Sequence, residues 1–322
     1  KIGEVPAKFV SNVSEEIFNE PIDVEVNKRI VDNQYDLIIS IGQVVPHEVV
    51  GMANYSKNIF VGCGGSNMIN STHMLGAVFG MERLLGKDYS PVRKVFDYAE
   101  EHFINKVPLI YVLTVTTQHE DKTAVNGLFI GRSRKVFDQA VKLSIQKNIT
   151  LMQKPLKKVV VYLNEHEFKS TWLGNKAIYR TRMAIADGGS LIILAPGVRQ
   201  FGEDAIIDKL IRKYGYVGRD KILKMYSNSD DLINNRSVAA HLIHGSTDGR
   251  FSVTYAVSHL TRSEIESVNY NYMPIEEAYL VYNPNALKDG FNCLPNGEEV
   301  YYISNPALGL WADKAKYASR AC

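Results

Sequence analysis

Residues 35–73 read "YDLIISIGQVVPHEVVGMANYSKNIFVGCGGSNMINSTH". The first eight residues are short, apolar, rich in β-branched side chains and closed by glycine, which predicts a buried β-strand. From residue 68 on, apolar side chains recur at helical spacing to residue 86, which predicts a helix. The segment between them holds a histidine, a lysine and a glycine cluster, and a second histidine, His73, follows within the helix. Because ligands of open α/β sheets bind beyond the carboxyl ends of strands, we expect the chemistry to lie here.

Strand-like and helix-like segments alternate along the rest of the chain. This alternation predicts an α/β fold of two lobes, each a mixed or parallel sheet flanked by helices, with a cleft between them. The length of 322 residues also favours about two domains. We expect one lobe over 1–155, carrying the site, and a second over 156–322, joined by a charged hinge at 153–159. Further strands are expected at 107–116, 127–131, 157–163, 190–197 and 250–258, and helices at 92–104, 133–147, 172–186, 203–215 and 274–283, with Asp187-Gly188-Gly189 as the C-cap of the helix at 172–186.

The composition excludes several classes of protein. Apolar residues make up 45% of the chain and charged residues 22%, as in ordinary globular proteins, and the net charge is +2. Without a lysine or arginine block, nucleic acid and anionic membranes are poor partners, and no apolar run reaches the length of a membrane span. Three cysteines, Cys63, Cys293 and Cys322, without a CxxC pair, favour a reducing compartment over a disulfide framework or structural zinc. We therefore expect a cytoplasmic protein; its oligomeric state is left open.

Two residues of the opening stretch are suited to proton or amine chemistry. His47 follows Pro46, which restricts the backbone, and an imidazole that titrates near neutrality can act as a general acid or base. Its alternative role is a hydrogen-bonded structural histidine. Lys57 stands between a tyrosine and apolar residues, where a desolvated amine becomes a nucleophile or a covalent anchor. Its alternative role is a solvated lysine whose stem covers apolar surface.

The glycine cluster and its neighbours offer further possibilities. Gly62 to Ser66 leads into a helix and could bind an anion there, but a plain turn is equally compatible with the pattern. His73 follows in the helix and could ligate a metal or simply pack. Cys63 lies close to the helix N-terminus, where a thiolate is activated, so a cysteine hydrolase with His47 or His73 as base is a rival hypothesis. A small buried cysteine is its alternative.

The combined pattern resembles the signature of the nickel-pincer-dependent lactate racemase family. In that signature a proline-histidine pair is followed after ten residues by a lysine and after sixteen more by a histidine, as are His47, Lys57 and His73. The preceding "DVEVNKRIVDNQYDLIISIG", residues 23–42, resembles the family's lead-in. The resemblance continues more thinly to about residue 285, through "FKSTWLGNKAIYRTRMAIADGGSLIIL" (168–194), "AHLIHGSTDGRFSVTYAVSHLTRSEIES" (240–267) and "PIEEAYLVY" (274–282).

The resemblance implies an isomerase, a nickel-dependent racemase or epimerase of a 2-hydroxy acid. Its cofactor is the nickel-pincer nucleotide, a pyridinium mononucleotide whose two sulfur-bearing arms hold nickel. The residue matching Lys57 anchors that cofactor through a thioamide, and the one matching His73 completes the nickel coordination, a sulfur and imidazole set that suits nickel(II). The position matching His47 is one of two histidines that move protons. Lys176 matches a lysine near the substrate, where a cation would hold the carboxylate.

This chain also departs from the family pattern. Asn54-Tyr55-Ser56 replaces the usual glycine-glycine-arginine before the anchoring lysine, and Leu173 stands where glutamine is common. No tryptophan occupies the family's late active-site position. The family's first catalytic histidine and its phosphate-binding aspartate and arginine would precede Lys1, so we expect either a further N-terminal segment of about a hundred residues or an incomplete mechanism. A family member with lost or changed activity that binds a small anion is therefore a second hypothesis.

Other histidines and one loop carry weaker signals. His241 and His244 form an HxxH pair that could bind a metal on one helix face, although structural roles are favoured because no third ligand is near. His119 and His166 lie in charged turns after strands, at the sheet edge where a substrate would bind. The loop from Arg199 to Asp204 could reach the same place.

Overall fold

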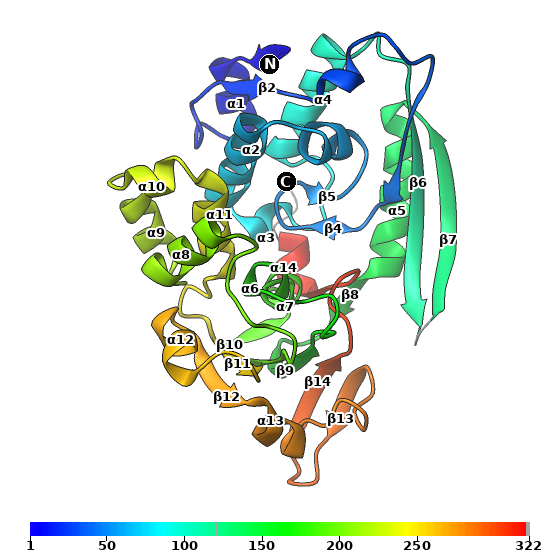
Figure 1. The fold of residues 1–322 in the computed structure, drawn as a ribbon. Helices are drawn as coiled ribbons and strands as arrows, with labels where there is room; N and C mark the ends of the chain where they lie inside the picture. The colour runs from blue at the N-terminus through cyan, green and yellow to red at the C-terminus, as the bar shows by residue number, and fades with distance from the viewer. Residues whose placement is uncertain (120–121, 320–322) are drawn as a thin grey trace. The chain divides into compact units, whose positions relative to one another are not determined.

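The chain folds into two compact units, shown as a ribbon in Figure 1. The computed structural model describes residues 1–119 and 122–319. The first unit comprises Lys1–Ile149 and the second begins at Thr150. Residues 156–159 of the segment expected as a hinge belong to a strand. The predicted α/β fold, with mixed and parallel sheets flanked by helices, is confirmed.

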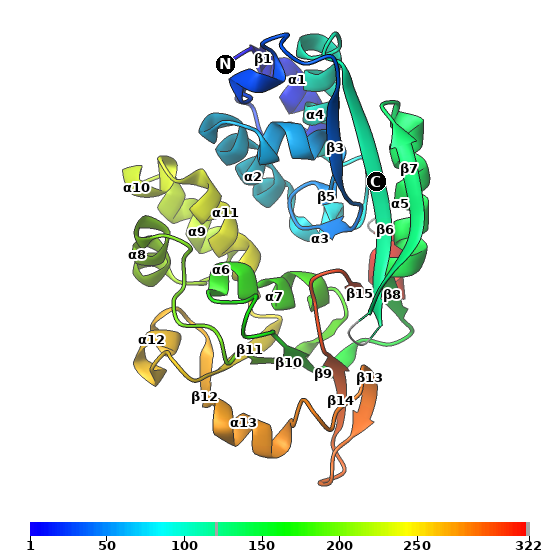
Figure 2. The ribbon, with the colours of Figure 1, turned by 45° about the vertical axis from the view of Figure 1, so that its right-hand side comes forward.

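The first unit is built around a three-stranded sheet in the order β3-β6-β7. Strands β3 and β6 run parallel, β6 and β7 run antiparallel, and helix α5 packs against β6 and β7 (Figure 2). Two small antiparallel pairs, β1-β2 and β4-β5, complete its strands. Its elements are β1 (Gly3–Val5), α1 (Ala7–Val13), β2 (Ile22–Val24), η1 (Lys28–Ile30), β3 (Ile38–Gln43), β4 (Pro46–His47), β5 (Gly51–Met52), η2 (Asn58–Gly62), α2 (Ser66–Phe79), α3 (Met81–Leu84), α4 (Pro91–Phe103), β6 (Leu109–His119), β7 (Lys122–Gly131) and α5 (Arg134–Asn148).

Strand β3 is not buried as predicted. Ser40 is buried, but Ile39 is 52% exposed and Ile41 is 68% exposed. Because side chains alternate along a strand, the two isoleucines share one face and Ser40 lies on the other. The apolar run correctly predicts a strand, and only the burial of one face is wrong.

The predicted helix at 68–86 is divided at Gly80. Helix α2 ends at Phe79, and α3 begins at Met81. Gly80 has φ +104°, a backbone conformation outside the α-helical region that glycine adopts without steric cost. Both helices bury apolar side chains, so the apolar spacing of the sequence continues through this break.

The second unit is built on a six-stranded sheet in the order β12-β11-β10-β9-β14-β13. Every neighbouring pair in it is parallel except β13-β14. Strands β8 and β15 form a separate pair. The remaining elements are β8 (Ile149–Met152), β9 (Leu156–Tyr162), α6 (Thr171–Gly174), α7 (Lys176–Thr181), β10 (Ile185–Leu194), α8 (Ala205–Tyr214), α9 (Arg219–Tyr226), α10 (Asp230–Ile233), α11 (Arg236–Gly245), β11 (Phe251–Val257), α12 (Arg262–Ser267), β12 (Asn271–Pro274), α13 (Ile275–Val281), β13 (Gly290–Cys293), β14 (Glu299–Ile303), β15 (Leu310–Asp313) and α14 (Lys314–Ser319).

The helix predicted at 172–186 is wrong in its extent. It is two short helices, α6 and α7, that meet at the buried Asn175. The Asn175 side-chain oxygen accepts a hydrogen bond from the hydroxyl of Tyr255 at 2.7 Å, which ties the junction to strand β11. The expected C-cap at 187–189 lies instead inside β10, where the pairing with β9 is irregular between Ile185 and Ser190. Among residues 1–119 and 122–319, no helix combines the length and apolar character needed to cross a membrane.

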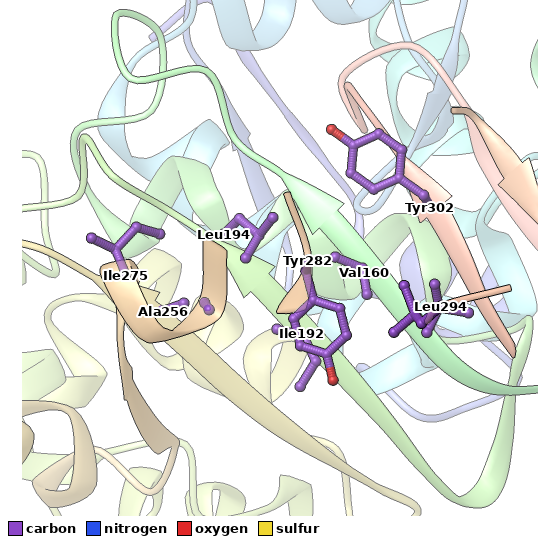
Figure 3. Close-up of a cluster of buried hydrophobic side chains, with 10 residues drawn as sticks. Val160, Ile192, Leu194, Ala256, Ile275, Tyr282, Leu294 and Tyr302 are labelled. Atoms are coloured by element: carbon purple, nitrogen blue, oxygen red, sulfur yellow. The ribbon is translucent and has the colours of Figure 1, made fainter. Parts of the chain in front are cut away.

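One face of the larger sheet carries a hydrophobic cluster (Figure 3). Val160 of β9, Ile192 and Leu194 of β10, and Ala256 of β11 contribute to it, and Ile275 of α13 covers them. On the opposite face, residues 159, 161, 193 and 255 are also buried. Burial on both faces is the normal state of a parallel sheet, and it explains the near-continuous apolar runs that predict these strands.

We expect Leu194→Ala to destabilise the second unit by about 2–5 kcal/mol, because it removes a fully buried side chain and leaves a cavity. Leu280→Ala is the matched control, since Leu280 is 88% exposed and its loss should change stability by less than about 0.5 kcal/mol. Urea unfolding of the full chain measures both effects. Equal unfolding midpoints for the two variants would contradict the assignment of Leu194 to the core.

Candidate functional site

The candidate site follows the carboxyl end of β3, where the chain folds into the β4-β5 hairpin. Pro46 pairs with Met52 and His47 with Gly51. Gly51 has φ +87°, and a β-carbon there would lie 2.0 Å from the carbonyl oxygen of Lys87. Only glycine fits this close approach, so the hairpin is held against the residues that follow α3.

His47 is fixed by its own hairpin. The backbone N–H of Val49 donates a hydrogen bond to Nδ1 of His47 at 3.1 Å, so the neutral ring carries its proton on Nε2. A carboxylate oxygen of Glu48 lies 4.0 Å from the same Nδ1, and both side chains are largely buried. The predicted base is thus accompanied by an acidic neighbour that the sequence interpretation did not single out, although it is the next residue in the chain.

Lys57 lies at the start of the short π-helix η2 and is partly buried. The turn before it, Asn54 and Tyr55, has the left-handed backbone conformation, with φ +71° and +57°. Glycine adopts this conformation most easily, so the chain keeps a glycine-like backbone where the lactate racemase family usually has two glycines.

His73 lies two turns into α2, and its Nδ1 is 2.7 Å from the carbonyl oxygen of Ile69. Because a carbonyl can only accept, Nδ1 carries the proton and the neutral ring presents the lone pair of Nε2. Burial is the main cause that lowers the pKa of His73, and the charge of Lys57 lowers it further. The hydrogen bond to Ile69 and the carboxylate of Glu48 act in the opposite direction and raise it. The charges of Lys57 and Glu48 therefore both act on the His73 ring.

The glycine cluster before α2 does not present an open anion site. The N–H of Asn67, in the first turn of α2, donates to the carboxylate of Glu25 at 2.9 Å, and the N–H of Gly65 donates to the carbonyl of Glu25. Gly64 forms a bridge with Val26. An internal carboxylate thus already occupies the first turn of α2, and the turn alternative of the sequence analysis is favoured.

Lys176 belongs to the second unit. It is the first residue of α7 and partly buried, directly after the buried Asn175. The Asn175 amide lies within 3.5 Å of Nε2 of His241, and its oxygen accepts from the hydroxyls of Tyr255 and Tyr270. A fixed hydrogen-bond network therefore sets the start of the helix that carries Lys176.

Within the HxxH pair, the contacts of His241 are structural. His241 and His244 are both buried on α11. Both ring nitrogens of His241 are hydrogen-bonded, Nδ1 to the hydroxyl of Tyr179 at 2.8 Å and Nε2 to that of Tyr216 at 2.9 Å, and its ring stacks on Trp172. The structural role favoured by the sequence analysis agrees with these contacts.

The remaining candidates have simpler surroundings. Cys63 is exposed, not buried as its alternative role required, and Cys322 lies outside the described residues. His166 is exposed beside Glu165, and the side chain of His119 lies outside the described part of the chain. In the loop at 199–204, Asp204 caps helix α8 by accepting from the N–H groups of residues 206 and 207. No group of three or more potential metal-ligating His, Cys, Asp or Glu side chains occurs within residues 1–119 and 122–319.

We expect His73 to make stability depend on pH. Its pKa is below 6.5 in the folded, cofactor-free protein, so the unfolded chain binds a proton that the fold does not. The stability contribution is complete above pH 6.5 and is lost as the pH falls below it, by at most about 1.4 kcal/mol per pH unit. Urea unfolding at pH 7.5 and 5.5 tests this, because His73→Gln should remove that part of the dependence. An unchanged pH dependence in the variant would contradict a neutral His73.

Comparisons with known proteins place these features in context. Residues 16–83 match the family model of the lactate racemase N-terminal domain, a range that contains His47, Lys57 and His73. Curated proteins give no match. A Thermotoga maritima protein of known crystal structure has a TM-score of 0.82 and 24% identity, over 97% of this chain and 75% of that one.

The second comparison structure is a lactate racemase apoprotein from Thermoanaerobacterium thermosaccharolyticum. It has a TM-score of 0.66 and 16% identity, over 89% of this chain and 64% of that one. At these identities the structural likeness shows the fold. Together with the match over residues 16–83, it supports a lactate racemase-like family for this chain, as the sequence resemblance predicts. Neither the small-anion binder nor the Cys63 hydrolase is favoured by these findings.

Proposed function

We propose that the protein is a racemase or epimerase of a 2-hydroxy acid that works with a nickel-pincer nucleotide tethered to Lys57. A lactate racemase-like family suggests an isomerase. The observation that carries the proposal is the match of residues 16–83, which contain His47, Lys57 and His73, to the lactate racemase N-terminal domain. The charge of Lys57 also acts on His73, which supports a site that both residues share.

The residues present fit this cofactor. His73 is partly buried, neutral and oriented by its bond to Ile69, so Nε2 offers one nitrogen donor to a metal. Since the described residues provide no cluster of three ligands, the other donors would come from the cofactor's own sulfur and carbon atoms, which suits a soft metal such as nickel. Lys57 provides the amine for a covalent tether. When bound, the nickel-pincer nucleotide supplies a centre that accepts and returns a hydride.

The protein's own task is to move the hydroxyl proton and to hold the substrate. His47 is proposed to exchange that proton at Nε2. In the tautomer that the hydrogen bond from Val49 favours, Nε2 carries a proton and can donate it, whereas proton uptake requires the ring to release the N–H of Val49. The Glu48 carboxylate, 4.0 Å from Nδ1, could then stabilise a proton at that nitrogen. We propose that Lys176 holds the substrate carboxylate.

The substrate class follows from these groups and from the departures in sequence. A cation suits a carboxylate, and a proton-exchanging imidazole suits a neighbouring hydroxyl. Leu173 replaces an amide that could donate hydrogen bonds, so a substrate more apolar than lactate is favoured. The chain spans 64% of the length of the lactate racemase it resembles, and its own activity is therefore proposed from its residues.

Co-expression with the cofactor-making enzymes tests the proposal. We expect the purified protein to contain nickel by elemental analysis and to interconvert the enantiomers of at least one 2-hydroxy acid in a panel that begins with lactate, measured by chiral chromatography. Nickel without interconversion would indicate a changed reaction, and protein without nickel would contradict the cofactor assignment.

A further inference from the structure

The turn before Lys57 has an unfavourable backbone for its residues. Asn54 and Tyr55 are consecutive, both have positive φ, and both are buried. Residues with a β-carbon rarely adopt this conformation, because the β-carbon approaches the following carbonyl oxygen, and each such residue costs free energy. Contacts within the unit can offset that cost and hold the turn.

Some of these contacts come from the turn itself. The Asn54 side-chain oxygen accepts hydrogen bonds from the N–H of Tyr55 at 2.7 Å and from the amide of Asn58 at 2.8 Å. The Tyr55 ring stacks on Phe137 of α5, and its hydroxyl donates to the carbonyl of Arg132 at 2.6 Å. These contacts fix the side chains of the two left-handed residues, but not the carbonyl groups of Met52 and Asn54.

The carbonyl groups are bound by Arg93 of α4, which has no exposed surface. Its guanidinium donates to the carbonyls of Met52 at 2.7 Å and Asn54 at 3.1 Å, and to the hydroxyl of Ser56 at 2.7 Å. All three acceptors lie in the five residues that immediately precede Lys57. The planar guanidinium can bridge such a set, which a lysine ammonium cannot do with the same geometry.

Burying this charge is costly, so a purely structural role would favour a close carboxylate partner. The Asp97 side chain contributes favourably, but it forms its ion pair with Arg134 at 3.4 Å. Burial lowers the pKa of Arg93 to about 10, which leaves it charged at neutral pH. The hydrogen bonds of the guanidinium are thus directed to the turn before Lys57, not to an acid.

We propose that Arg93 is the positioning residue of the cofactor anchor: it holds residues 52–56 in the left-handed turn and so sets the direction of Lys57. This inference rests on the proposed function for what Lys57 does, but the geometry it concerns exists without cofactor. Arg93 does not touch substrate or cofactor in this account. It takes over, from α4, the role that glycine would have in making such a turn.

Hydrogen exchange of the cofactor-free protein tests the inference. In Arg93→Met we expect the peptide covering residues 53–57 to exchange about tenfold faster than in the parent, which corresponds to about 1.4 kcal/mol in the free energy of local opening. Arg182→Met is the matched control, because Arg182 is another buried arginine that donates to carbonyls, those of His244 and Ser246 in the second unit. It should leave exchange at 53–57 within about twofold of the parent. Unchanged exchange there in folded Arg93→Met would overturn the inference.

A milder variant covers the case in which Arg93→Met does not fold. Ser56→Ala removes one of the three acceptors and should raise exchange at 53–57 by about threefold. The rate of acetylation of Lys57 relative to the exposed Lys135, measured by peptide mass spectrometry, should change in the same variant. If neither quantity moves, Arg93 does not position Lys57. Both readouts are independent of the cofactor, so a parent protein that acquires no nickel would contradict the proposed function and leave this result intact.

Discussion

Replacing Lys57 with alanine is expected to remove both the covalent adduct and all measurable racemisation. Lys57 is proposed as the attachment point of the group that carries the hydride chemistry, and alanine has no amine with which to form the bond. Peptide mass spectrometry of protein co-expressed with the cofactor-making enzymes should show a mass increment on the Lys57 peptide of the parent and none in the variant. Chiral chromatography of the same samples measures turnover.

The matched control for this experiment is Lys135→Ala. Lys135 is an exposed lysine of α5 in the same unit, and its loss should leave adduct and turnover unchanged. An adduct that persists in Lys57→Ala, or that maps to another lysine, would contradict the assignment of the tether. Equal loss in both variants would point to a failure of folding, which circular dichroism of the two proteins would reveal.

His47→Gln is expected to slow turnover by about 10²–10⁴-fold while the nickel content stays at the parental level. Glutamine keeps a polar side chain of similar reach but cannot exchange a proton with the substrate hydroxyl. Because His47 is proposed to act on the proton and not on substrate binding, kcat should fall much more than KM changes. Initial rates in both directions of the reaction measure this split.

A companion variant, Glu48→Gln, separates the contribution of the Glu48 carboxylate from that of the His47 imidazole. Glu48 lies 4.0 Å from His47 Nδ1, so we expect its loss to lower the pH at which the rate changes, because a carboxylate stabilises the protonated imidazole.

A His47→Gln protein that retains kcat within about threefold would show that another group exchanges the hydroxyl proton.

The central strands β9, β10 and β11 of the second unit were predictable from sequence, whereas β8 and β12 to β15 were not predicted. The three central strands are short apolar runs because both sheet faces are covered, and Val160 and Ile193 illustrate this burial on opposite faces. The first unit was harder. Residues 35–42 have the same composition as a buried strand, yet Ile41 is exposed, because composition reports strand propensity and not which faces are covered.

The predicted ends of helices were wrong where tertiary contacts determine the ends. The apolar spacing around Asn175 continues as though one helix ran from 172 to 186. The helix is divided at the buried amide, which is hydrogen-bonded to Tyr255 of β11 and to Tyr270. No local pattern reports such a partner eighty residues away. Gly80, by contrast, is a local signal for a break, because glycine inside an apolar helical pattern weakens the helix and adopts positive φ without strain.

The sequence predicted residues for the candidate site but not the residues that support them. The spacing of His47, Lys57 and His73 predicted a site in the first unit, which stays a prediction, whereas Glu48 and Arg93 carried no motif. Arg93 lies in an ordinary amphipathic helix, and its importance follows from the carbonyls it binds. The replacement of two glycines by Asn54 and Tyr55 looked like a disruption, yet both residues keep the glycine-like backbone. Sequence alone could not show this, because backbone conformation at such positions depends on contacts from α4 and α5.

The central claim is that Lys57 and His73 contact the same small molecule. A crystal structure of the co-expressed, nickel-containing protein, with anomalous scattering recorded at the nickel edge, tests it most directly. We predict a nickel peak bonded to Nε2 of His73 and continuous electron density from the metal's ligand to Nζ of Lys57. A nickel peak remote from His73, or a ligand that reaches His73 without density to Lys57, would contradict the account.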